Sequence, residues 1–260
     1  MRHTPKSAWE GIKVLAGGML SHHKALTVMR FKLPNGNLAV SDTENASILG
    51  PHFKRVYTNH RKIDWTVLDN IQQRMTMVEL DTKITLEELK KAVTKSAKGK
   101  SPVLNKVPPD AFKALSEKNL SLLLDFLNAF CNKETDFDEW HEGQVIPVPK
   151  SGDLSDPNKW CGVTLMDLGS KIFSSILSMQ LFHIIKEHGV KYQFGSTPGV
   201  GCQDGSFAIK TMLHLRHNHN LPTWVMFADL VKAFNNSNHI ILIEILRKYG
   251  CPPKLCSAIK

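Results

Sequence analysis

A single carboxylate, Asp229, directly follows a run of apolar residues, Trp224–Ala228. A run of this length, with Pro222 just before it, predicts a strand that is buried on both faces. A carboxylate at the end of such a strand is costly to bury unless a suitable partner meets it. The partner could be Lys232 in an ion pair, the backbone of the following turn in a cap, or a Mg²⁺ ion, which prefers hard carboxylate oxygens. The spacing alone leaves these three possibilities open.

The segment around this carboxylate, FADLVKAFNNSNH, resembles motif A of the reverse transcriptases of non-LTR (LINE-type) retrotransposons, F-x-D-L-x-K-A-F-D followed by a polar stretch and His. The resemblance implies that Asp229 and the backbone carbonyl of Leu230 hold catalytic Mg²⁺. It also implies that Phe234 excludes a 2′-hydroxyl and so selects deoxynucleotides. Polymerase chemistry uses two metal ions about 4 Å apart, and the family completes its site with an aspartate pair in F/Y-x-D-D. These 260 residues contain no Asp-Asp dipeptide, and Asn235 replaces the Asp of the motif. We therefore expect the isolated chain to be inactive as a polymerase.

A basic segment upstream, KGKSPVLNKVPPDAF, resembles the family's K-x-P-G-x-D-G-[IV]-P, which leads into the fingers. Its two usual glycines are replaced here by Val103 and Lys106, which predicts a distorted loop. Four lysines in and before the segment are expected to contact nucleic-acid phosphates without reading sequence: Lys95, Lys98, Lys100 and Lys106. The alternative is a solvated, charged helix end.

Two further segments extend the resemblance. FDEWHEGQVIPVPKSGDLSDPNKWCGVTLMDLGSKIF matches the W-x-x-x-x-[IV]-x-P-[IV]-x-K-x-G-D region, and Lys150 matches the fingers lysine that meets the incoming triphosphate. The family's arginine is replaced by Cys161, which cannot supply a permanent, forked cation. KYQFGSTPGVGCQD resembles Q-x-G-F-R-x-G, and the resemblance implies that Gln193 contacts nucleic acid.

Composition agrees with a globular protein that binds a polyanion. Lysine and arginine number 33 against 24 acidic residues, giving a formal charge of +9, which favours nucleic acid or an acidic surface, although a merely basic protein is the alternative. The resemblance implies an RNA template, a DNA primer and deoxynucleotides as partners; no protein partner is indicated. Five cysteines without paired spacing argue against a secreted disulfide framework. With no apolar run of about 20 residues and no signal peptide, we expect an intracellular protein, in the cytoplasm or nucleus, away from membranes.

Local signals predict the elements that position these residues. Asn35-Gly36 predicts a hairpin between strands at 28–33 and 38–40. Helices are predicted over 43–57, with Ala46, Leu49 and Phe53 on one face, and after the capping box of Thr85 and Glu88. Further helices are predicted from Ser116, from Asp167 to about Glu187, from Asp204, and over 240–249.

The predicted fold is α/β (α+β) and mostly helical, corresponding to reverse transcriptase fingers and an incomplete palm. Residues 1–83 form a poorly defined N-terminal segment, and residues 84–260 a partial reverse transcriptase domain that ends after motif A. The predicted function is that of a retrotransposon RNA-directed DNA polymerase fragment. The alternatives are a non-catalytic nucleic-acid-binding remnant and an unstable fragment without activity.

Overall fold

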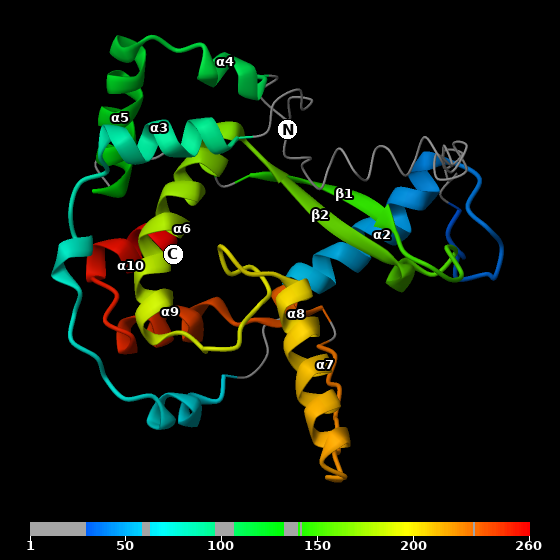
Figure 1. Cartoon of the computed structure of the whole chain (residues 1–260). Helices are drawn as coiled ribbons and strands as arrows, with labels where there is room; N and C mark the ends of the chain where they lie inside the picture. The colour runs from blue at the N-terminus through cyan, green and yellow to red at the C-terminus, as the bar shows by residue number, and fades with distance from the viewer. Residues whose placement is uncertain (1–29, 59–62, 97–106, 133–139, 141, 231) are drawn as a thin grey trace, which may run out of the picture. The chain divides into compact units, whose positions relative to one another are not determined.

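The computed structural model describes residues 30–58, 63–96, 107–132, 140, 142–230 and 232–260 (Figure 1). This part of the chain is mostly helical and contains one two-stranded antiparallel sheet, which confirms the mixed, mainly helical class. The elements in chain order are α2 (Asp42–Tyr57), η1 (Trp65–Asn70), η2 (Val78–Leu80), α3 (Leu86–Lys95), α4 (Pro109–Lys113), α5 (Glu117–Cys131), β1 (Gly143–Pro149), η4 (Pro157–Lys159), β2 (Trp160–Met166), α6 (Leu168–His188), α7 (Cys202–Asn218), α8 (Ala233–Asn236), α9 (His239–Lys248) and α10 (Pro253–Ile259).

The chain divides into two compact units. One comprises the described residues up to Arg55 together with Pro147–Gly162, and the other comprises the described residues of Val56–Ile146 and Val163–Lys260. The strands β1 and β2 pass from one unit to the other. The boundary predicted between residues 83 and 84 stays a prediction.

The first unit is built around Phe31 and Trp160. Phe31 is fully buried, and its ring meets the Trp160 indole edge-on with centroids 5.5 Å apart. The Phe31 amide donates to Oδ1 of Asn45 at 3.2 Å, which fixes the segment against α2. The predicted Asn35-Gly36 turn is present, with Gly36 at a φ of 85° and a single antiparallel bridge between Lys32 and Leu38.

The buried face of α2 agrees only in part with the predicted one. Leu49 and Phe53 are half-buried, but Ala46 is exposed, and Asn45 and His52 are the buried residues of the helix. The apolar pattern does not predict the burial of Asn45, which accepts a hydrogen bond from the Phe31 amide and therefore costs little to bury.

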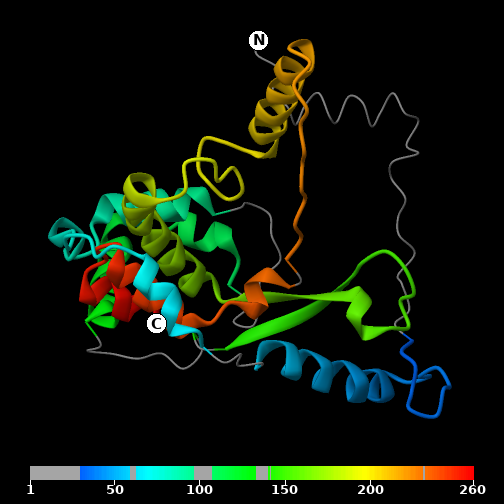
Figure 2. The same cartoon turned by 90° about the horizontal axis from the view of Figure 1, so that it is seen from below.

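The second unit is a helical bundle. Figures 1 and 2 show α3, α5 and α10 packed around α6. The predicted capping box begins α3: the Thr85 amide donates to Glu88 Oε2 at 2.8 Å, and the Glu88 amide donates to Thr85 Oγ1 at 3.2 Å. Leu89, at the centre of this helix, is fully buried. The predicted helix starts at Ser116 and Asp167 are also confirmed: each residue is an N-cap, since Ser116 accepts from the Asn119 amide and Asp167 from the Gly169 amide.

The centre of the bundle is α6, nine of whose residues are buried. It is the one helix in the described segments that is long and apolar enough to cross a membrane. Its buried residues include Ile172, Ile176 and Ile184, all within the core of the second unit, so it reads as a core helix. Aromatic rings extend this core: Phe173 lies 5.2 Å from Phe130 and 5.9 Å from Trp140 between centroids.

The helix α7 differs from its neighbours because none of its residues is buried. Its N-cap is Gly201, whose amide donates to Oδ2 of Asp204 at 2.7 Å. Asp204 therefore supports the first turn from within the helix, and its prediction as the cap residue is corrected by three positions.

Candidate nucleic-acid interface

The apolar run before Asp229 is not a buried strand. Residues 221–230 carry no regular secondary structure, and Trp224, Met226 and Phe227 are 96%, 90% and 86% exposed. The predicted strand is therefore wrong for this structure, whereas the assignment of this region to the start of a palm stays a prediction. The physical reason is that a strand exists only through backbone pairing, and no described segment pairs with this one. The apolar side chains consequently have no second layer to pack against.

Asp229 and Leu230 lie in this exposed segment, with Leu230 75% exposed. No ion pair joins Asp229 to Lys232 within the described chain. Lys232 itself occupies the N-cap of α8 in a left-handed conformation, with a φ of 49° and no side-chain cap. Of the two structural explanations for Asp229, pairing with Lys232 is thus not observed, and capping of the turn that follows stays a prediction because that turn includes Val231, outside the described residues.

The residues present do not by themselves fit a two-metal site. No group of three or more His, Cys, Asp or Glu side chains gathers into a metal-ligand cluster anywhere in the described segments. A divalent ion held for catalysis needs several oxygen ligands, and Mg²⁺ keeps near-octahedral geometry. Asp229 with one backbone carbonyl supplies too few. Phe234, in α8, is 89% exposed, so its ring does not line an enclosed nucleotide pocket in this structure.

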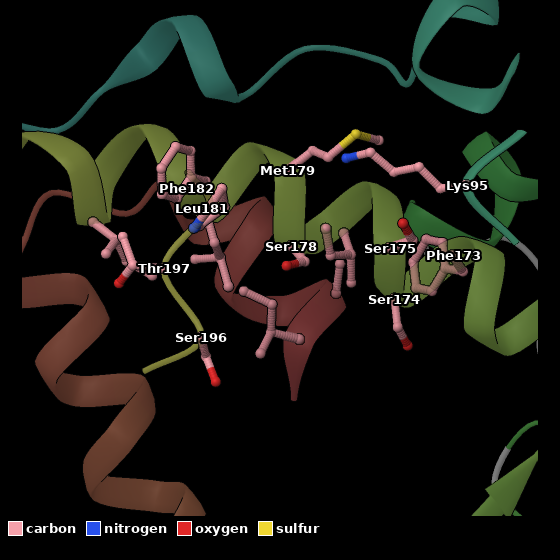
Figure 3. A pocket seen from close by; sticks show the side chains of 15 residues that line it. Lys95, Phe173, Ser174, Ser175, Ser178, Met179, Leu181, Phe182, Ser196 and Thr197 are labelled. Carbon is pink, nitrogen blue, oxygen red and sulfur yellow. The ribbon is translucent and has the colours of Figure 1, made fainter. Parts of the chain in front are cut away.

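Lys95 lines a cavity of about 580 Å³ in the second unit (Figure 3). The cavity runs along α6 past Ser174, Ser175 and Ser178 and reaches Thr197 in the loop that precedes α7. In Figure 3 the Lys95 amine is drawn beside Met179 above α6, whereas the Ser174 hydroxyl points below it. The cavity thus offers one cation and several hydroxyl groups, but they do not converge on one point.

The other predicted nucleic-acid contacts are dispersed. Gln193 is exposed, and its side-chain amide donates to the Gly195 carbonyl at 2.9 Å, which stabilises the loop; its contact with nucleic acid stays a prediction. Lys98, Lys100 and Lys106 lie outside the described residues. The sequence gives no signal for the serines of α6, because nothing local distinguishes a cavity-lining serine from any other serine on a helix.

Lys150 follows the last residue of β1, at the position that the sequence predicts for a phosphate-binding lysine. It is exposed, and its amide donates to the carbonyl of Lys159 at 2.8 Å across the end of the hairpin. The loop between them contains Asp153, whose carboxylate accepts from the hydroxyl and amide of Ser155 and pairs with Lys32 at 3.3 Å. These hydrogen bonds from Ser155, followed by the Lys32 ammonium group, lower the Asp153 pKa to about 2.

The sequence is similar to those of several proteins of transposable elements. Over 200 residues, 75% of this chain, the sequence is 28% identical to an uncharacterized 149 kDa protein of transposon TX1 from Xenopus laevis. Over 111 residues it is 22% identical to the retrovirus-related Pol polyprotein of a type-1 R2 retrotransposable element from Popillia japonica. Over 109 residues it is 24% identical to that of the type-2 element R2DM from Drosophila melanogaster. The chain spans 15%, 15% and 10% of these proteins, respectively. No protein-family model matches the sequence.

Proposed function

We propose that this chain, which is homologous to proteins of non-LTR retrotransposons, is part of an RNA-directed DNA polymerase and contributes fingers and the first part of the palm. The observation that carries the proposal is the segment FADLVKAFNNSNH around Asp229, found in a chain whose relatives include two Pol polyproteins. In this proposal RNA is the template, DNA the primer and deoxynucleotides the substrates.

The division of roles follows from the side chains present. Asp229 and the Leu230 carbonyl contribute one side of a Mg²⁺ site, and Phe234 meets the sugar of the incoming nucleotide. The ion, when bound, stabilises the negative charge that develops during phosphoryl transfer. Because Asp229 is exposed and no metal-ligand cluster forms among the described residues, we propose that the chain alone does not catalyse DNA synthesis. Further carboxylates have to come from another segment.

The experiment compares the chain alone with a chimera. In the chimera a palm segment with an F/Y-x-D-D pair, taken from a non-LTR reverse transcriptase, follows Lys260. On a primed poly-A template with Mg²⁺, the chain alone should not extend the primer and the chimera should. Asp229→Asn should abolish extension by the chimera. Asp125→Asn, which removes an exposed carboxylate from α5, is the matched control and should leave extension unchanged.

Two results would contradict this proposal. Extension by the chain alone that is lost in Asp229→Asn would mean that the chain completes its own metal site. Extension by the chimera that persists in Asp229→Asn would mean that this carboxylate is not a catalytic ligand.

A second candidate function, a non-catalytic nucleic-acid-binding protein, is favoured by the formal charge of +9. Such binding is expected to be micromolar and tolerant of sequence, because lysine–phosphate contacts do not read bases. Its affinity should fall steeply between about 50 and 200 mM salt, as bound counterions are released. Fluorescence anisotropy with labelled single-stranded RNA measures this slope. A flat dependence on salt would show that phosphate contacts are not the main source of affinity.

A further inference from the structure

Two lysines face each other at the loop end of the β1–β2 hairpin. The hydrogen bond from the Lys150 amide to the Lys159 carbonyl, 2.8 Å long, makes them directly opposed residues. Opposed residues of an antiparallel pair project their side chains from the same face. Both lysines are exposed. Like charges in this arrangement repel each other, so the pair is unfavourable unless an anion lies between or beside them.

A glycine helps to place the second lysine. Gly152 has a φ of +105°, and Cδ, Cε and Nζ of Lys159 lie 3.6, 3.4 and 3.8 Å from the point that a Cβ on Gly152 would occupy. The aliphatic part of Lys159 therefore lies over the backbone at Gly152, and its ammonium group lies beside the loop. A Cβ at position 152 would touch Lys159 only at ordinary contact distance, so the positive φ, and not a lack of space, favours glycine there.

The acidic residues of the same loop do not neutralise these lysines. One carboxylate oxygen of Asp153 accepts from Ser155, and the other pairs with Lys32. Asp156 accepts from the amide and the side chain of Asn158. Within the described chain no ion pair includes Lys150 or Lys159. The hairpin end thus presents two unneutralised positive charges whose neighbouring acids are already engaged.

The loop that carries the pair is fixed in place from two sides. The Trp160 indole donates to the Leu154 carbonyl at 2.8 Å, and the Lys32 amide donates to the Ser155 carbonyl at 3.2 Å. Trp160 is itself almost fully buried. Because the loop backbone is already fixed, binding a ligand at the lysines requires little additional loop ordering and so little loss of conformational entropy.

We propose that Lys150 and Lys159 together bind the triphosphate of a nucleotide, with Lys159 supplying the second cation of the site. The inference rests on the proposed function for the choice of a nucleotide as ligand; the pairing of the lysines rests on the hairpin geometry. A chain of phosphates suits two nearby ammonium groups because each lysine is a mobile point charge that can follow a different phosphate. Lys159 also restores a second positive charge next to Cys161, where the resembling family has an arginine.

The test uses the 260-residue chain and inorganic tripolyphosphate, with affinity measured by isothermal titration calorimetry at low ionic strength. Lys159→Gln and Lys150→Gln should each weaken binding by roughly 5- to 10-fold, as expected for the loss of one charge-assisted contact. Lys118→Gln removes an exposed charge from α5, outside this loop, and should change affinity by less than about 2-fold, since screened distant charges contribute little. Lys159→Arg should retain most of the affinity.

A second measurement does not depend on any variant. In the unmodified chain, tripolyphosphate should shift the NMR amide signals of Gly152 and Lys159 more than that of Lys118. Equal losses in Lys159→Gln and Lys118→Gln would overturn the proposal, because binding would then follow overall charge. So would a loss of RNA affinity in Lys159→Gln with unchanged tripolyphosphate binding, which would make the pair an RNA contact. Tripolyphosphate binding requires neither primer nor polymerase chemistry, so its failure is distinct from a failure of the chimera to extend a primer.

Discussion

The exposure of the segment before Asp229 predicts an unusual mutational result. Phe227 and Phe173 are the same residue type, but Phe227 is 86% exposed whereas Phe173 is 5% exposed and packs against Phe130 and Trp140. Replacing a buried phenylalanine by alanine costs about 3–5 kcal/mol, because apolar contacts are lost and a cavity remains. Replacing an exposed one changes stability by about 0.5 kcal/mol or less.

Phe227→Ala should therefore leave the free energy of unfolding nearly unchanged, and Phe173→Ala should lower it by about 3–5 kcal/mol. Urea denaturation followed by circular dichroism measures both values in the same background. Amide hydrogen exchange gives an independent reading, because the unpaired amides of Trp224–Ala228 should exchange much faster than those of α6.

The opposite result is equally clear. If Phe227→Ala costs more than about 2 kcal/mol, or if the amides of Trp224–Ala228 are strongly protected, the segment is packed as the sequence alone predicts. The reasoning from its exposure would then be refuted. In the chimera with the added palm segment, by contrast, Phe227→Ala should become destabilising, because the strand would gain neighbours.

Three further changes test the fold around the candidate interface. Gly250→Ala should destabilise the chain by at least about 2 kcal/mol in urea denaturation, because the residue has a φ of +84° and a Cβ would collide with the Met75 carbonyl oxygen; a loss below about 0.5 kcal/mol would contradict the described turn. Thr85→Ala should cost about 1 kcal/mol through loss of the α3 cap, and Thr85→Ser should recover most of it. The Asp153 carboxyl should titrate by NMR near pH 2. Because its folded-state pKa is lowered, the stabilisation it gives is present above about pH 4 and is lost as the pH falls toward 2; in Lys32→Gln the midpoint should move upward.

The sequence by itself determined the elements whose signals are local. The capping box of Thr85, the caps at Ser116 and Asp167, and the Asn35-Gly36 turn were all predicted and are present. Each depends on residues within about four positions of one another, where the hydrogen bonds are set by helix or turn geometry. The resemblance to proteins of non-LTR retrotransposons could likewise be read from the sequence, and the relatives confirm it.

Only the tertiary structure decided which of these residues have neighbours. The run Trp224–Ala228 has the composition of a buried strand, but burial requires a second strand and a covering layer, which no local pattern can supply. In α2 the burial of Asn45 depends on the backbone donor of Phe31, 14 positions away. Lys159 became a partner of Lys150 through the hairpin pairing and the open space above Gly152. In each case the deciding interaction joins segments that are separated along the chain, so its outcome depends on how they pack in space.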